Sequence, residues 1–136
     1  PSGKLGRQLS ILVDDVMRKG DLVPLISPSS NIQDAIIEMT EKGMGMTLIA
    51  KNNQVVGIFT DGDLRRFLQR ANKPLTGKIS EVMTKSPQTI GRYTLAIDAA
   101  QMMEQHLINQ LIVVEEESEN IVGAINMHDL LQAKVI

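Results

Sequence analysis

The sequence has 136 residues, a net charge of −2, no cysteine and 43% hydrophobic residues, which is typical of one globular domain or two small ones. This charge lacks the basic surplus of nucleic-acid-binding proteins, and no apolar run approaches the ~18 residues of a membrane span. The absence of cysteine excludes disulfides and suits a reducing compartment. We therefore expect a cytoplasmic protein with neither a nucleic-acid nor a membrane partner.

The first half of the chain predicts a helix, a β-hairpin and a second helix. The first helix, over 31–42, has one apolar face with helical spacing, made of Ile32, Ala35, Ile36 and Met39. Glycines at 43 and 45 end this helix. Two apolar strands follow, Met46–Ala50 and Gln54–Thr60, and their turn contains Asn52 and Asn53, which tolerate positive φ. The second helix has an apolar face of Leu64, Phe67, Leu68 and Ala71.

The second half of the chain repeats this order after a linker at 72–77. The opening Val13–Met17 recurs as Lys78–Met83, and Gly57 and Asp63 recur as Gly123 and Asp129, 66 residues later. The first helix face recurs as Ala96, Ala99, Ala100 and Met103. One copy of ~60 residues buries little surface by itself, so we expect the two copies to pack sheet against sheet around one core. A cleft between such halves is a natural place for a small ligand.

A strand leads directly into a helix at the same point of each copy, with Thr60 and Asp63 in the first and Asn126 and Asp129 in the second. The spacing fits a capping box, in which each pair closes its own helix start. The same place also suits a ligand, because free helix N–H groups attract phosphate and a carboxylate can accept hydrogen bonds from ribose hydroxyls. Since the pattern recurs in both copies, the sequence favours the two interpretations about equally.

The pattern Gly-x-x-Thr-x-x-Asp-Leu at 57–64, after an Asp-Val-Met opening and repeated in tandem, resembles the CBS domain over residues 11–136. The resemblance implies an α/β (α+β) fold of two CBS repeats, 11–73 and 74–136, each with a β-α-β-β-α core, related by pseudo-two-fold symmetry. In that family the Thr or Ser and the Asp bind the ribose and phosphate of an adenosine nucleotide, which implies Thr60, Asp63 and Asp129. Asn126 departs from the usual Thr or Ser. Family ligands also touch backbone, which implies contacts near 84–89 and near 44–48 or 109–111.

A narrower resemblance starts at residues 1–9, which are similar to the end of the sugar-isomerase (SIS) domain of arabinose-5-phosphate isomerases. Residues 59–66 and 126–131 resemble the CBS pair of that family. The resemblance implies that residues 1–10 are the tail of an upstream catalytic domain and that this chain is a piece without catalysis. Such enzymes interconvert ribulose 5-phosphate and arabinose 5-phosphate, which supplies Kdo for lipopolysaccharide or capsule. The resemblance also implies a homodimer through the CBS pair and a tetramer of the full enzyme.

The candidate ligand is a small molecule, and two chemistries stay open. The CBS resemblance implies AMP, ADP or ATP, whereas the isomerase resemblance suggests the end product CMP-Kdo. Arg65 and Arg66 follow Asp63 and could pair with a phosphate or carboxylate, although a solvated helix face explains at least one of them. The candidate ligand-binding residues are Thr60, Asp63, Arg65, Arg66, Asn126, His128 and Asp129.

Two alternatives compete with a sensing module. The apolar helix faces would also suit an oligomerisation module that binds no ligand. An independent enzyme has little support, because no clear nucleophile or base is present. His106 and His128 lie far apart in a sequence without cysteine, so we expect no metal site and no required cofactor.

Overall fold

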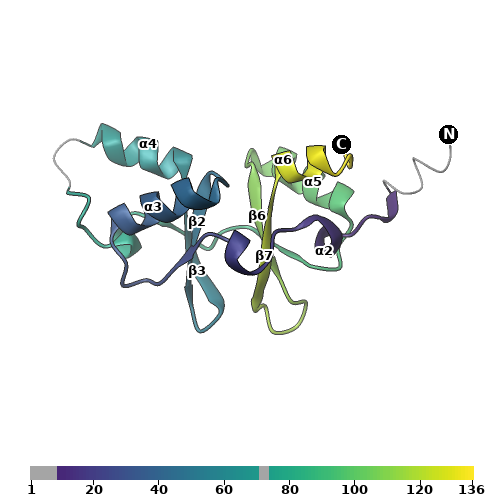
Figure 1. Ribbon diagram of the computed structural model, residues 1–136, viewed down its shortest axis with the longest axis horizontal. Helices are drawn as coiled ribbons and strands as arrows, with labels where there is room; N and C mark the ends of the chain where they lie inside the picture. The colour runs from purple at the N-terminus through teal and green to yellow at the C-terminus, as the bar shows by residue number, and fades with distance from the viewer. Residues whose placement is uncertain (1–8, 71–73) are drawn as a thin grey trace. The chain divides into compact units, whose positions relative to one another are not determined.

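The computed structural model describes residues 9–70 and 74–136 and divides into two compact units. The central unit comprises residues 21–87, and the terminal unit joins the residues up to 20 with residues 88–136. Each unit contains one sheet with helices packed on it (Figure 1). Within the described residues, no helix is long and apolar enough to span a membrane. Most of the isomerase-like segment 1–9 and part of the linker, with Ala71, lie outside the described residues.

The central unit has a four-stranded sheet in the order β1-β2-β3-β4. β1 is parallel to β2, and the other neighbours are antiparallel. In chain order, after a short 3₁₀ turn η1 (Gly20–Leu22) at the boundary, the elements are β1 (Leu25–Ile26), α3 (Ile32–Lys42), β2 (Met46–Lys51), β3 (Gln54–Thr60), α4 (Asp61–Gln69), the 3₁₀ turn η2 (Ile79–Glu81) and β4 (Thr84–Lys85). This order confirms the predicted helix, hairpin and helix.

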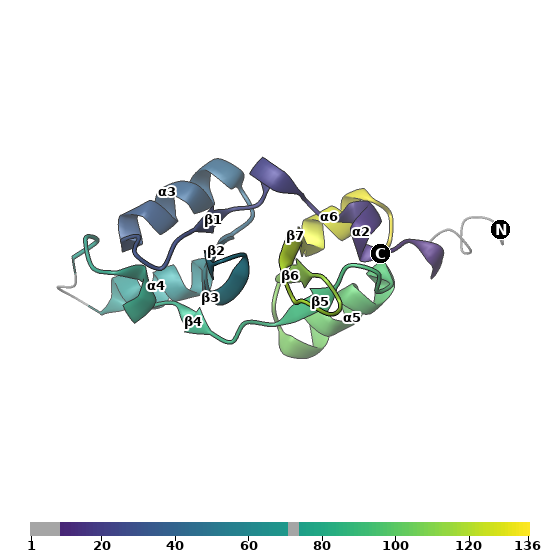
Figure 2. The ribbon, with the colours of Figure 1, turned by 90° about the horizontal axis from the view of Figure 1, so that it is seen from below.

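The terminal unit repeats this arrangement with a three-stranded sheet in the order β5-β6-β7, which Figure 2 shows from below. Its elements are α2 (Val13–Val16), β5 (Thr89–Gly91), α5 (Ala96–His106), β6 (Gln110–Val114), β7 (Ile121–Asn126) and α6 (Met127–Gln132). The mixed α/β fold predicted from the sequence is confirmed.

The opening segment of each sequence repeat lies in the unit that holds the hairpin of the other repeat. Thr84, from the second opening, pairs with Ile58 of β3, and Arg18, from the first, pairs with Ala124 of β7. A glycine in each strand makes room for the approach, at 57 and at 123. The compact units therefore exchange their openings, and the repeat boundaries at 11–73 and 74–136 stay a prediction.

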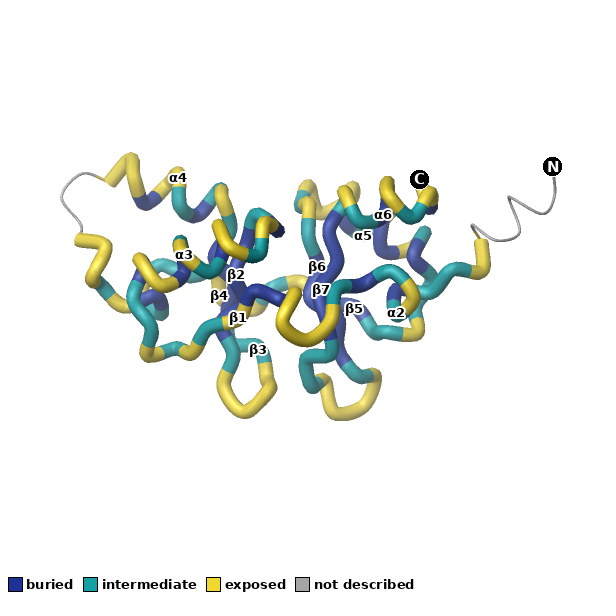
Figure 3. Tube along the Cα trace, in the orientation of Figure 1, coloured by how far each residue is buried: buried dark blue, intermediate teal, exposed yellow. Residues whose placement is uncertain are grey.

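The predicted helix faces form the core of each unit. Ile32, Ala35 and Met39 of α3 are buried, as are all four predicted positions of α5, whereas Ile36 is half-buried (Figure 3). Asn31 caps α3 and Gly43 ends it with a φ of 66°. The central unit buries a cluster of Ile32, Ala35, Met39, Ile49, Phe59, Phe67 and Ile79.

One core prediction in α4 was wrong. Leu68 is 66% exposed, whereas Phe67 is buried and Leu64 is half-buried. The buried stripe of α4 contains Asp63 and Phe67, which are four residues apart, so Leu68 lies about 100° further around the helix. A carboxylate thus occupies a position that an apolar side chain would fill in an ordinary amphipathic helix.

A buried hydroxyl joins β2 to α3 in the central unit. Thr47 is fully buried, and its hydroxyl donates to the carbonyl oxygen of Ala35 at 3.0 Å. We expect Thr47→Val to lower the free energy of unfolding by about 1 kcal/mol, because a buried hydrogen bond is lost. Thr40→Val is the control, since the Thr40 hydroxyl makes a similar bond to Ile36 at 2.8 Å but is exposed. Equal losses in urea unfolding of the two variants would contradict the prediction.

Candidate ligand-binding site

The predicted capping box at the start of α4 is present. The Asp63 N–H donates to the Thr60 hydroxyl at 3.1 Å, and the Thr60 N–H donates to Oδ2 of Asp63 at 2.9 Å. Thr60 has an extended backbone as the last residue of β3 and the N-cap of α4. The strand and the cap together hold the Asp63 carboxylate at a helix N-terminus, where negative charge is favoured.

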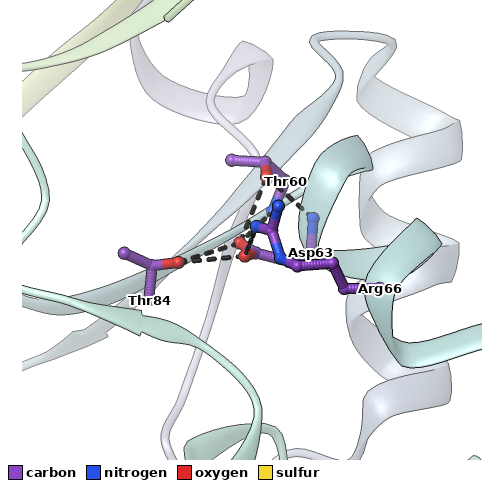
Figure 4. Close-up of polar contacts among 4 residues, drawn as sticks. All are labelled: Thr60, Asp63, Arg66 and Thr84. Carbon is purple, nitrogen blue, oxygen red and sulfur yellow. Dashed lines mark hydrogen bonds and ion pairs between the residues drawn. The ribbon is translucent and has the colours of Figure 1, made fainter. Parts of the chain in front are cut away.

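The Asp63 carboxylate also binds partners outside its own capping box, which Figure 4 shows. The Thr84 hydroxyl, from β4, donates to Oδ1 at 3.0 Å and lies 3.2 Å from Oδ2. Nη2 of Arg66 donates to Oδ1, and within the box itself the Thr60 hydroxyl also lies 3.1 Å from Oδ2. Asp63 is only 7% exposed. A carboxylate this well supplied with hydroxyl donors can bind the hydroxyls of a sugar in the same manner.

Arg66 joins this carboxylate to the surface of α4. Its side chain is 62% exposed although it pairs with the buried Asp63. It lines a small cavity of about 50 Å³ with Asp63, Phe67, Arg70 and Val82. It also lines an open groove of about 260 Å³ with Gly62, Arg65 and Gln69. The structure therefore brings the two predicted arginines to one groove beside Asp63, where an anionic group would meet two guanidinium groups.

The corresponding place in the terminal unit has the same capping box but a different partner. The Asp129 N–H donates to Oδ1 of Asn126 at 2.8 Å, and the Asn126 N–H donates to Oδ2 of Asp129 at 3.1 Å. The further partner is Arg18, whose Nη2 donates to Oδ1 of Asp129 at 3.1 Å and whose Nε lies 3.2 Å from both oxygens. Asp129 therefore binds a guanidinium where Asp63 binds the hydroxyl of Thr84.

A model of the CBS domain matches residues 13–70 and 79–136. The chain belongs to the CBS domain family. The CBS pair is 45% identical over 135 residues to arabinose 5-phosphate isomerase KdsD of Francisella tularensis and 42% identical over 137 residues to KdsD of Pseudomonas aeruginosa. The matches cover 99% and 100% of this chain but 41% and 42% of those relatives, so the chain spans about two-fifths of their length. Both predicted resemblances are thereby confirmed.

The fold of the CBS pair is also that of solved CBS structures. It superposes on a CBS domain protein from Pyrobaculum aerophilum complexed with AMP with a TM-score of 0.77, at 20% identity, over 88% of this chain and 90% of that one. At this identity the likeness shows the fold alone.

Backbone just before or at the start of β2 and β6, in or beside the other predicted contact segments, binds the first residues of α4 and α6. The Gly45 carbonyl, in the predicted segment 44–48, accepts the Asp61 N–H at 3.0 Å, and the Asn109 carbonyl accepts the Met127 N–H at 2.9 Å. His128 is exposed in the first turn of α6, and His106 is the last residue of α5. The assignment of ligand-binding residues stays a prediction.

Sequence reasoning missed two residues, Thr84 and Arg18, which bind the equivalent carboxylates of Asp63 and Asp129. Thr84 was expected only as part of a backbone segment, and Arg18 was not considered. A signal for both was present, because Met17 aligns with Met83 at the shift of 66 residues and so aligns Arg18 with Thr84.

The terminal unit also contains a second charged cluster, centred on Arg92, which does not include Asp129. Nε of Arg92 donates to Oδ1 of Asp14 at 2.8 Å, and Nη1 donates to Glu115 of the second hairpin loop. These hydrogen bonds, the one to Asp14 first, raise the pKa of Arg92 above its ordinary value. The guanidinium also lies 5.3 Å from the centre of the Tyr93 ring. The cluster joins α2, the end of β5 and the hairpin loop, so its role is structural.

Proposed function

We propose that this CBS pair is the regulatory part of an arabinose-5-phosphate isomerase and that it binds a nucleotide or nucleotide-sugar beside Asp63. The observation that carries the proposal is the buried Asp63 carboxylate, surrounded by the hydroxyls of Thr60 and Thr84 next to the groove of Arg65 and Arg66. The catalytic groups would lie in the part of the isomerase that this chain does not span. The proposal places the protein in the cytoplasm with other enzymes of sugar-phosphate metabolism.

The geometry supports separate binding places for two parts of the ligand, its sugar hydroxyls and its anionic group. The hydroxyls of a ribose would replace part of the hydroxyl shell around Asp63, since a carboxylate accepts hydrogen bonds from either source equally well. A phosphate or carboxylate would lie over the groove of α4, near its N-terminal N–H groups and the guanidinium groups of Arg65 and Arg66. At about 260 Å³ the groove is smaller than the ~300–1,000 Å³ of a complete small-molecule site, which suits part of a nucleotide.

Two ligand chemistries fit these two binding places. An adenosine nucleotide is supported by the AMP complex of the Pyrobaculum aerophilum protein. CMP-Kdo is supported by the isomerase relatives and by the logic of end-product feedback, and its carboxylate and phosphate would supply two anions for the two arginines. We propose CMP-Kdo as the regulator, with an adenosine nucleotide as its rival.

Isothermal titration of this chain with CMP-Kdo, CMP, AMP and ATP separates the candidates. We expect CMP-Kdo to bind more tightly than CMP, because the Kdo carboxylate adds a charged contact that CMP lacks. Tighter binding of AMP or ATP than of CMP-Kdo would replace feedback by energy sensing. No heat from any of the four would contradict ligand sensing altogether.

Oligomerisation is a second candidate function, favoured by exposed leucines on the helices that follow the two capping boxes. Leu68 of α4 is 66% exposed and Leu131 of α6 is 55% exposed. Exposed apolar side chains on helices are candidates for a homodimer interface, and a dimer through the CBS pair would favour a tetramer of the full enzyme. Light scattering of the wild-type chain and of Leu68→Gln tests this: a dimer that Leu68→Gln dissociates supports the interface, and a wild-type monomer excludes it.

A further inference from the structure

The two units neutralise equivalent carboxylates with guanidinium groups that come from different parts of the chain. Asp63 pairs with Arg66, three residues further along the same helix. Asp129 pairs with Arg18, which is 111 residues away in sequence. The position in α6 that corresponds to Arg66 holds Gln132, which is exposed, and the position that corresponds to Arg18 holds Thr84. Each unit thus has one guanidinium at its carboxylate, supplied by the helix itself in one unit and by the opening segment in the other.

Arg18 is held more firmly than Arg66. Its backbone forms a two-bond bridge with Ala124 of β7, with N···O distances of 2.8 and 3.1 Å. Its side chain is 21% exposed and meets Asp129 with two nitrogens, which is the strong forked geometry of arginine–carboxylate pairs. The Arg66 side chain is 62% exposed and extends from a helix surface, so it can move away from Asp63 without breaking any backbone pairing.

We infer that the chain carries one nucleotide position, at Asp63, and that Arg18 closes the corresponding position at Asp129. This inference rests on the proposed function. A ribose at Asp63 would displace an exposed arginine and exchange its own hydroxyls for those of Thr60 or Thr84, and the charge of Arg66 then becomes available to the anionic end of the ligand. A ribose at Asp129 would have to separate a forked ion pair whose arginine is only 21% exposed and is fixed by strand pairing. The Asn126 cap, in place of a threonine, removes a further hydroxyl from that position.

The test is the number of nucleotides bound per chain, measured by equilibrium dialysis with labelled AMP and labelled CMP-Kdo as separate probes. We expect one per wild-type chain and none for Asp63→Asn. Arg18→Thr reproduces the Thr84 arrangement, so we expect it to bind two per chain and the double variant with Asp63→Asn to bind one. Arg92→Thr is the matched control, because it removes from the same unit a carboxylate-paired arginine that is also 21% exposed, and it should still bind one.

The outcomes separate this inference from the proposed function. Two nucleotides per wild-type chain, with one left in Asp63→Asn, would overturn the single position while the sensing function stands. One per chain in folded Arg18→Thr would overturn the closing role of Arg18. No binding of either probe by any variant would overturn the proposed function and the inference with it. If Arg18→Thr does not fold, the counts for the wild type and Asp63→Asn still decide whether one position exists.

Discussion

Asp63→Asn is expected to weaken binding of CMP-Kdo, or of AMP if that is the ligand, by about 100-fold. The variant keeps the shape of the side chain but removes the charge and one acceptor oxygen, so that at least two hydrogen bonds from ligand hydroxyls lose their charged partner. Hydrogen bonds to charged groups contribute ~1.5–3 kcal/mol each, so the loss of two predicts at least this factor. Isothermal titration of the variant beside the wild type gives the ratio of Kd values.

Asp34→Asn is the matched control for this variant. Asp34 is the third helical residue of α3 and closes the Asn31 capping box as Asp63 closes that of Thr60. It is exposed, and its N–H donates to Oδ1 of Asn31 at 2.8 Å. The control should therefore reproduce the small loss of cap stability without changing the Kd. Affinity within twofold of the wild type for Asp63→Asn, or an equal loss for both variants, would remove Asp63 from the site.

Gly123→Ala is expected to have the largest effect on stability, about 2–4 kcal/mol, because the new methyl group cannot be accommodated by side-chain movement. A Cβ at 123 would lie 2.5 Å from the carbonyl oxygen of Arg18, which is fixed by its pairing with β7. To relieve the overlap, the opening segment must move away from the strand. The same movement would loosen the Arg18–Asp129 pair.

Gly57→Ala is the control, at the corresponding place in β3. The three atoms that would lie nearest to its Cβ all belong to the side chain of Met83, and an unbranched methionine can change its rotamer. We expect a loss of about 1–2 kcal/mol for this variant. Urea unfolding of both variants measures the difference. Equal stabilities would show that the opening segment of the terminal unit is not held as closely as its contacts indicate.

Much of the fold is readable from local sequence patterns. The faces of α3 and α5 follow from apolar residues at helical spacing, and the turn between β2 and β3 follows from two asparagines, which have φ values of 53° and 60°. The capping boxes of Thr60 and Asn126 are also local, because the paired residues are three positions apart. Repetition at a fixed shift then identified the tandem repeat, which the family match confirms.

The partners of the two carboxylates could not be read in this way. Thr84 reaches Asp63 across 21 residues, and Arg18 reaches Asp129 across 111, through a pairing of opening segments with the hairpin of the other repeat. No local periodicity encodes that exchange. The prediction for Leu68 failed because apolar spacing alone does not show that a carboxylate, Asp63, shares the buried stripe of α4 with Phe67, which leaves Leu68 exposed.

The most direct test of whether a ligand binds at Asp63 is an NMR titration of the ¹⁵N-labelled chain with CMP-Kdo and, separately, with AMP. The shifts of the backbone amide signals report which residues the ligand affects. Saturable binding should shift the signals of residues 60–66 and of Thr84. Those of Arg18 and of residues 126–132 should stay nearly unchanged, because the pair of Arg18 and Asp129 remains closed. Shifts confined to residues 126–132, or no shift with either compound, would contradict ligand sensing at Asp63.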